Sequence, residues 1–216
     1  MMTIYLVLWR AHPAGSETQS QGGFCMIYMF LADGFEEIEA LCPVDMLRRA
    51  GLEVTTIAVH PDPQSTDKMV TGSHGIGVLA DKSYTEMAAQ SVPADLEMVI
   101  LPGGMPGSKH LDGSALVERY LKAAADKGAY MAAICAAPMV LGKRGYLAGK
   151  KAVCYPGFEE YLQGADVQDC AVAVDGKVIT GCGMGAAMQF GGALIRMMKG
   201  AEKEEAILSA ILADRV

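Results

Sequence analysis

One cysteine, Cys135, stands where an apolar strand pattern changes into a helical one, within AYMAAICAAPMVLGKRG (residues 129–145). Ala136 and Ala137 follow it and leave space beside the sulfur. A thiol at a helix N-terminus faces unpaired N–H groups and the positive end of the helix dipole, which favour the thiolate. We therefore expect Cys135 to be a nucleophile with a lowered pKa that iodoacetamide alkylates first. A buried structural cysteine is the alternative, because free cysteine is often buried.

A second chemical feature is the glycine loop LPGGMPG (residues 101–107), which follows an apolar strand pattern. Gly103 and Gly104 permit close approach and unusual backbone dihedrals, so the loop can present free N–H groups. Together with the N–H of Ala136, these groups would form an oxyanion hole for a tetrahedral intermediate. An ordinary tight turn is the alternative interpretation.

Three acidic residues, Glu36, Glu37 and Glu39, crowd the start of the helix predicted in DGFEEIEAL (residues 33–41). Attraction to the helix dipole and solvation explain Glu36 and Glu37 without any function. Glu39 has apolar neighbours on both sides, which indicates a buried carboxyl group. Beside a thiolate this carboxyl would keep its proton, because desolvation and a neighbouring anion both raise its pKa.

These features need a scaffold in which three loops meet. From Met26 onward apolar strands alternate with helices, which is typical of a mainly parallel sheet covered by helices on both faces. Because ligands bind at the carboxyl ends of such strands, the three loops are expected to converge there. The pattern predicts strands over 26–32, 53–59 and 97–104 and before Cys135, hairpins within 68–80 and 168–181, and helices over 35–50, 114–128, 185–199 and 202–213. Pro43 is expected to kink the first helix or to mark an irregular turn.

The composition excludes several classes of function. The chain has 216 residues, enough for one domain with a sizeable core, and its net charge of -7 argues against nucleic-acid binding. No apolar run approaches the roughly 20 residues of a membrane-spanning helix, so we expect no membrane partner. The six cysteines show neither a CxxC pair nor zinc spacing. We therefore expect reduced thiols, no metal and a cytoplasmic protein.

Residues 1–25 differ in character from the rest of the chain. Their apolar start, MMTIYLVLW, lacks the basic region and the cleavage site of a secretory signal, and a polar segment follows it. We expect a non-native or dispensable extension over 1–25 and a single domain over 26–216. An edge strand at residues 3–9 is the alternative.

Three motifs together resemble the ThiJ/PfpI superfamily, and in particular the branch of the parkinsonism-associated deglycase and its bacterial relatives. They are LADGFEEIEALCPVDMLRRAG (31–51), VILPGG (99–104) and AAICAAPMVL (132–141). The resemblance runs from Met26 nearly to the C-terminus. It implies a flavodoxin-like three-layer α/β sandwich and a homodimer, with no cofactor. It also implies a reactive cysteine at Cys135, a partner carboxylic acid at Glu39, and oxyanion donors from Gly104 and Ala136.

The sequence departs from this family at positions that carry a general base in relatives. Members resembling the intracellular-protease branch have histidine directly after the cysteine, where this chain has Ala136. The deglycase branch often has histidine where this chain has Tyr155, and an arginine of the later glycine loop is Cys182 here. None of the four histidines (12, 60, 74 and 110) stands at a matching place, which argues against peptidase activity.

Tyr155 stands where related sequences often have histidine, so its chemical role must differ from that of a general base. A phenol donates a hydrogen bond but is no base at neutral pH. We expect Tyr155 to line the pocket and to orient a substrate oxygen. A core aromatic residue whose hydroxyl reaches solvent is the alternative.

The resemblance implies a glyoxalase or deglycase. Cys135 would attack methylglyoxal, glyoxal or their early adducts on protein, and Glu39 would transfer the protons that lead to lactate or glycolate. A redox-sensing or chaperone-type stress protein, whose cysteine oxidises reversibly, is one alternative. A small-metabolite binder on the same scaffold is another. Whether Cys42, Cys154 or Cys182 pairs with Cys135 stays open.

Overall fold

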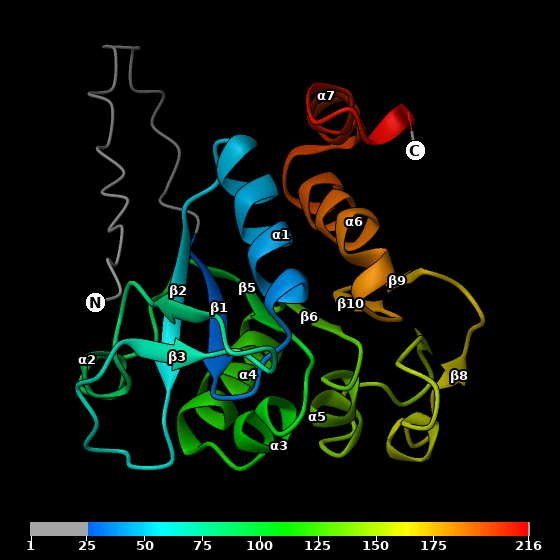
Figure 1. Ribbon diagram of the computed structural model, residues 1–216. Coiled ribbons are helices and arrows are strands. Elements are labelled where there is room, and N and C mark those ends of the chain that lie inside the picture. The colour runs from blue at the N-terminus through cyan, green and yellow to red at the C-terminus, as the bar shows by residue number, and fades with distance from the viewer. Residues whose placement is uncertain (1–25, 216) are drawn as a thin grey trace.

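The computed structural model describes residues 26–215. The expected extension over 1–25, with the alternative edge strand at 3–9, lies outside these residues. A six-stranded sheet forms the centre, in the order β2-β1-β5-β6-β10-β9 (Figure 1). All neighbours in it are parallel except β10 and β9. The strands are β1 (Met26–Ala32), β2 (Val54–Val59), β5 (Leu96–Leu101), β6 (Tyr130–Ile134), β9 (Val172–Asp175) and β10 (Val178–Gly181).

Helices cover both faces of this sheet, as the alternating pattern predicted (Figure 1). Successive side chains of a strand point to opposite faces. In β1, Ile27 and Met29 pack with α1 and α6, whereas Tyr28 and Phe30 pack with α4. The helices are α1 (Glu37–Arg49), α2 (Tyr84–Ala88), α3 (Gly107–Asp112), α4 (Ala115–Lys127), α5 (Pro138–Gly142), α6 (Ala187–Lys199) and α7 (Ala201–Ala210). The result is a three-layer sandwich whose parallel strands have the flavodoxin-like order.

Short strand pairs and 3-10 helices lie outside the central sheet. The hairpin expected within 68–80 is confirmed, and a short parallel pair, β7 with β8, follows α5. These strands are β3 (Met69–Thr71), β4 (Gly77–Leu79), β7 (Lys151–Ala152) and β8 (Asp166–Val167), and the 3-10 helices are η1 (Glu159–Tyr161), η2 (Met184–Ala186) and η3 (Ala213–Arg215). No helix within 26–215 has both the length and the apolar character needed to cross a membrane.

Local sequence signals fix the helix that carries Glu39. Glu36 is the N-cap of α1, and its carboxylate accepts a hydrogen bond from the backbone N–H of Glu39 at 2.7 Å. The helix then continues through Pro43 to Arg49, so no irregular turn forms there. Pro43 is buried where α1 packs on α6, and a Cβ at Gly191 would lie only 3.4 Å from its Cα. This packing stabilises the helix despite the lost backbone hydrogen bond.

Candidate active site

Cys135 lies between the end of β6 and the start of α5, as predicted. Its φ of 64° falls in the left-handed region that residues other than glycine rarely adopt. Its N–H donates to the carbonyl of Gly181 at 2.9 Å, and its carbonyl accepts from the N–H of Tyr155 at 2.8 Å. Neighbouring chain segments thus hold a strained backbone in place, a condition that is concentrated at functional sites.

Glu39 reaches the thiol from α1, and its side chain is only 1% exposed, as its apolar neighbours indicated. One carboxyl oxygen, Oε2, accepts a hydrogen bond from the N–H of Gly103 at 3.0 Å. The other, Oε1, is buried and has no hydrogen-bond partner among the described residues. A Cβ on Gly103 would lie 2.4 Å from Oε2 of Glu39 and 2.5 Å from Cβ of Cys135. Only glycine therefore fits between the two reactive side chains.

The predicted oxyanion donors separate into two roles. The N–H groups of Gly104 and Ala136 stabilise the charged form of Cys135 and so act to lower the pKa of its thiol. The N–H of Gly103 has a different role, because it donates to the side chain of Glu39. The carbonyl of Gly103 accepts a hydrogen bond from the backbone N–H of Glu36 at 2.9 Å. Gly103 thus positions the carboxyl group, and Gly104 and Ala136 remain as the donors that a developing oxyanion can use.

The thiol and the carboxyl group shift each other's protonation. Burial raises the pKa of Glu39 to about 7, although the neighbouring thiol of Cys135 and the hydrogen bond from Gly103 oppose the shift. Burial also raises the pKa of the Cys135 thiol, and the negative charge of Glu39 raises it further. The lowered pKa expected of Cys135 is therefore wrong. The helix α5 has only five residues, so its dipole and the two N–H groups do not outweigh burial. Near neutral pH Glu39 therefore gains and loses its proton, whereas the thiol of Cys135 stays protonated.

Tyr155 lines a cavity of about 960 Å³ beside the nucleophile. Its side chain is 51% exposed, so the expectation of a pocket position holds and the core alternative is excluded. Gly183 lies on the same wall. A Cβ there would come 3.3 Å from the Tyr155 ring and 4.0 Å from Oε1 of Glu39. The wall of the cavity and the unpartnered oxygen of Glu39 are therefore neighbours.

Tyr155 gives a first testable prediction. If its hydroxyl orients a substrate oxygen, Tyr155→Phe should raise KM for an aldehyde substrate about threefold to tenfold, which corresponds to the free energy that one hydrogen bond contributes to binding. The rate at which iodoacetamide alkylates Cys135 at fixed pH should be almost unchanged, because the phenol orients the substrate and not the thiol. Tyr161→Phe, outside the cavity lining, is the control. Alkylation of Cys135 slowed about tenfold in Tyr155→Phe would instead place the phenol among the groups that activate Cys135.

The cavity also gathers residues that the sequence did not predict to lie together. Cys154, Cys170 and Cys182 line it together with Glu159 and Asp169. Their loops meet because β10 pairs with β6 and because β7 pairs with β8, and no spacing along the chain signals that meeting. Within the described part of the chain every cysteine is a free thiol, namely Cys42, Cys135, Cys154, Cys170 and Cys182.

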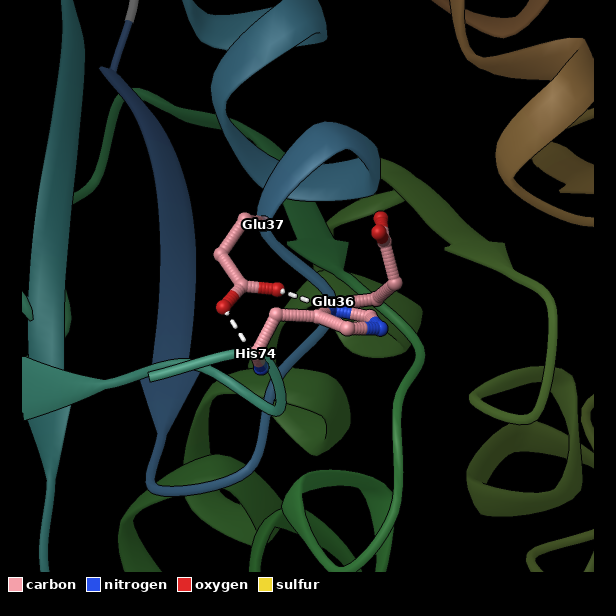
Figure 2. A group of neighbouring side chains, drawn as sticks. All are labelled: Glu36, Glu37 and His74. Atoms are coloured by element: carbon pink, nitrogen blue, oxygen red, sulfur yellow. Dashed lines mark hydrogen bonds and ion pairs between the residues drawn. The ribbon is translucent and has the colours of Figure 1, made fainter. Parts of the chain in front are cut away.

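Glu37 ties α1 to the turn of the β3–β4 hairpin (Figure 2). Its Oε1 accepts from the N–H of His74 at 2.7 Å, and its Oε2 lies 2.8 Å from Nδ1 of the same residue. The expected solvation of Glu37 is wrong, since the residue is only 2% exposed. Among residues 26–215, Glu36, Glu37 and His74 alone bring three potential metal ligands within 4.8 Å. Both oxygens of Glu37 are already hydrogen-bonded, so we assign this cluster a structural role.

This tie predicts a pH-dependent stability. Burial alone would raise the pKa of Glu37, but the hydrogen bonds from His74 and Ile76 lower it to about 2. The unfolded chain then binds the proton first as the pH falls, so stability present above about pH 4.5 is lost towards pH 2. The pKa of His74 is raised by Glu37, so its contribution is present below its ordinary pKa and is lost as the pH rises through the raised value.

We therefore expect His74→Ala to flatten the decline of the urea midpoint between pH 5 and pH 3. His110→Ala, which removes a histidine whose ring bonds the carbonyl of Asp33, is the control. An unchanged acid slope in His74→Ala would show that the tie contributes nothing to acid stability.

The sequence matches the DJ-1/PfpI family over residues 26–197. It is 34% identical to Protein dj-1beta of Drosophila melanogaster over 186 residues, which cover 85% of this chain and 95% of that protein. It is 37% identical to Protein DJ-1 homolog B of Arabidopsis thaliana over 175 residues, 80% of this chain. The matched part spans only 38% of that longer plant protein. The chain is also similar to "Glutathione-independent glyoxalase DJ-1" of Schizosaccharomyces pombe, at 27% identity over 189 residues, 86% of this chain and 97% of that protein.

Solved structures show the same arrangement of strands and helices. "Toxoplasma gondii DJ-1, oxidized" superimposes with a TM-score of 0.79 at 33% identity, and the match covers 87% of this chain and 98% of that one.

Proposed function

The chain belongs to the DJ-1/PfpI family, and on that premise we propose that it is a cysteine-dependent enzyme that converts methylglyoxal and glyoxal into lactate and glycolate without glutathione. The name of the Schizosaccharomyces pombe relative supports this reaction. The observation that carries the proposal is the pairing of Cys135 with a buried carboxyl group whose pKa is near 7 and whose Oε1 is unpartnered. A group of this pKa can both accept and return a proton at neutral pH.

The first step is addition to the aldehyde. The sulfur of Cys135 bonds to the aldehyde carbon, the thiol proton passes to the carboxylate of Glu39, and the aldehyde oxygen becomes an oxyanion. The N–H groups of Gly104 and Ala136, which stabilise negative charge on the sulfur, would stabilise an oxyanion on the carbon bonded to it. Glu39 then returns the proton to give a neutral hemithioacetal.

The second step is an internal oxidation and reduction. The carboxylate of Glu39 removes the proton from the former aldehyde carbon and delivers it to the adjacent carbonyl carbon, and the hydroxyl proton of the hemithioacetal passes to the oxygen of that neighbouring carbonyl. The former aldehyde becomes a thioester while the neighbouring carbonyl becomes an alcohol. Water then adds to the thioester, the carbon–sulfur bond breaks, and the thiol of Cys135 is restored. Methylglyoxal gives lactate and glyoxal gives glycolate, with no external oxidant.

We extend the proposal to early aldehyde adducts on protein as substrates, to a cytoplasmic location and to a homodimer. The open cavity beside Cys135 supports access by an adduct, and the free cysteines support a reducing compartment. The exposed apolar side chains of Ile38, Ile76 and Leu79, at the start of α1 and in the hairpin, support association. Sedimentation equilibrium measures the last of these directly.

A redox-sensing role is the second candidate. The structurally similar Toxoplasma gondii DJ-1 is described as oxidized, and this supports a redox role for the present chain. In this chain Glu39 would donate a hydrogen bond to a sulfinate on Cys135. Sulfinate formation on Cys135 at low peroxide, without aldehyde turnover, would favour this candidate.

The decisive experiment follows lactate formation from methylglyoxal by the purified chain in glutathione-free buffer. We expect lactate to form in proportion to enzyme concentration and with saturation by substrate. Lactate formation no faster than in buffer, or formation that requires added glutathione, would contradict the proposed function.

A further inference from the structure

The cavity beside Cys135 is acidic. Glu159 and Asp169 are exposed on its lining, which includes no lysine, arginine or histidine among residues 26–215. The remaining lining is formed mostly by thiols and apolar side chains such as Val153 and Met184. A cavity of this character repels an anion by charge and offers it no cationic partner.

The charge of Glu159 acts within the cavity and not only at its mouth. The carboxylate is held in place because its Oε2 accepts the N–H of Gly157 at 2.8 Å. Burial raises the pKa of the neighbouring Cys154 thiol to about 11, and the charge of Glu159 contributes to that shift. Cys154 is itself buried in the wall, so the field of Glu159 reaches the interior surface.

The same wall leads directly to the nucleophile. Tyr155, which follows Cys154, donates its N–H to the carbonyl of Cys135. On the same wall, a Cβ at Gly183 would come 4.0 Å from Oε1 of Glu39, a buried oxygen that has no hydrogen-bond partner among the described residues. Tyr155 and Gly183 therefore connect the lining that carries Glu159 and Asp169 to Cys135 and Glu39, so both carboxylates act on a ligand that approaches Cys135 from the cavity.

We propose that Glu159 and Asp169 form a charge filter that admits neutral and positively charged aldehydes to Cys135 and disfavours anionic aldehydes. This inference rests on the proposed function only in that aldehydes bind at Cys135, and it does not require turnover. Each carboxylate is exposed, so solvent screens its effect. For a unit charge taken to lie roughly 8 Å away in water of low ionic strength, each carboxylate changes the affinity about twofold to threefold, and the two together about fivefold.

The test uses two pairs of aldehydes that bind a thiol reversibly, and the two members of each pair differ chiefly in charge. Glyoxylate is an anion and methyl glyoxylate is its neutral ester, whereas betaine aldehyde is a cation and 3,3-dimethylbutanal is its neutral counterpart of similar shape. Protection of Cys135 from iodoacetamide, followed by mass spectrometry of its peptide, gives an affinity for each aldehyde without any turnover. Wild type is compared with Glu159→Gln/Asp169→Asn, because glutamine at 159 can still accept the N–H of Gly157.

We expect the double variant to bind glyoxylate about fivefold more tightly and betaine aldehyde about fivefold more weakly than wild type, with both neutral aldehydes unchanged within twofold. The differences should shrink at high salt. Glu160→Gln/Asp166→Asn removes two exposed carboxylates outside the lining and is the matched control. Equal shifts in the control, or the same charge preference in wild type and double variant, would overturn the inference. Normal charge selectivity without lactate formation would contradict the proposed function alone.

Discussion

Cys135→Ala should abolish aldehyde turnover, with kcat/KM falling at least about 1,000-fold. The covalent intermediate needs a nucleophilic sulfur, and no other described group bonds the aldehyde carbon in the proposed mechanism. Alanine keeps a Cβ at this position, so the strained backbone at φ 64° is no less accessible than before. Lactate formation from methylglyoxal measures the loss, and the unfolding midpoint checks that the fold survives.

Two control variants make this result specific. Cys170 lines the same cavity and is exposed, and Cys42 lies on α1 near the core. Cys170→Ala and Cys42→Ala should retain activity within about threefold. Residual turnover above a tenth of wild type in Cys135→Ala would mean that another group performs the addition.

The second large effect belongs to Glu39. Glu39→Gln keeps the size of the side chain and a carbonyl oxygen for the N–H of Gly103, but it cannot carry a proton between two carbon atoms. We expect kcat to fall about 100-fold or more. The wild-type rate should also change with pH near 7, where Glu39 titrates, and that dependence should vanish in the variant. Rates measured from pH 5 to pH 9 test both statements.

Stability separates a catalytic from a structural role for Glu39. Because its folded pKa of about 7 lies above the ordinary value, the unfolded chain loses this proton first, and stability declines from about pH 4.5 to pH 7. Glu39→Gln removes that decline and should be at least as stable as wild type at pH 8. Glu36→Gln, which retains an oxygen for the helix cap, is the control and should keep most activity. A near-normal rate in Glu39→Gln would reassign Glu39 to structure.

Much of the fold follows from the sequence because its elements are long and strongly patterned. The strand expected over 26–32 is β1, and the helix expected over 114–128 is α4, which Gly128 ends in the left-handed conformation. Short elements such as α2 and α3 escaped prediction, since a helix of five or six residues leaves little periodicity. The pair β7–β8 has two residues in each strand, and only its tertiary setting defines it.

The positions of the candidate site residues could be predicted from the sequence, but their electrostatics could not. The types of Cys135, Glu39, Gly104 and Ala136, and the loops that carry them, were enough to bring them together. The pKa of the thiol was not predictable, because it depends on how deeply the sulfur is buried and on how near Glu39 lies. The spacing of residues along the chain indicates neither of these. The acidic character of the cavity was hidden for the same reason, since its walls come from separate loops.

The hydrogen bonds that hold the site join residues far apart in the chain. Gly103 binds the side chain of a residue 64 positions earlier, and Cys135 is fixed by the carbonyl of Gly181 on β10. Such non-local contacts form late in folding, because the chain loses the entropy of closing long loops before these hydrogen bonds can form. In a chain growing on the ribosome, Cys135 is made dozens of residues before Gly181, whose carbonyl accepts the hydrogen bond from the N–H of Cys135. Recovered turnover during refolding is therefore a measure of the completed sheet, and chains halted before β10 should be inert towards aldehydes even though their cysteine and glutamate are already made.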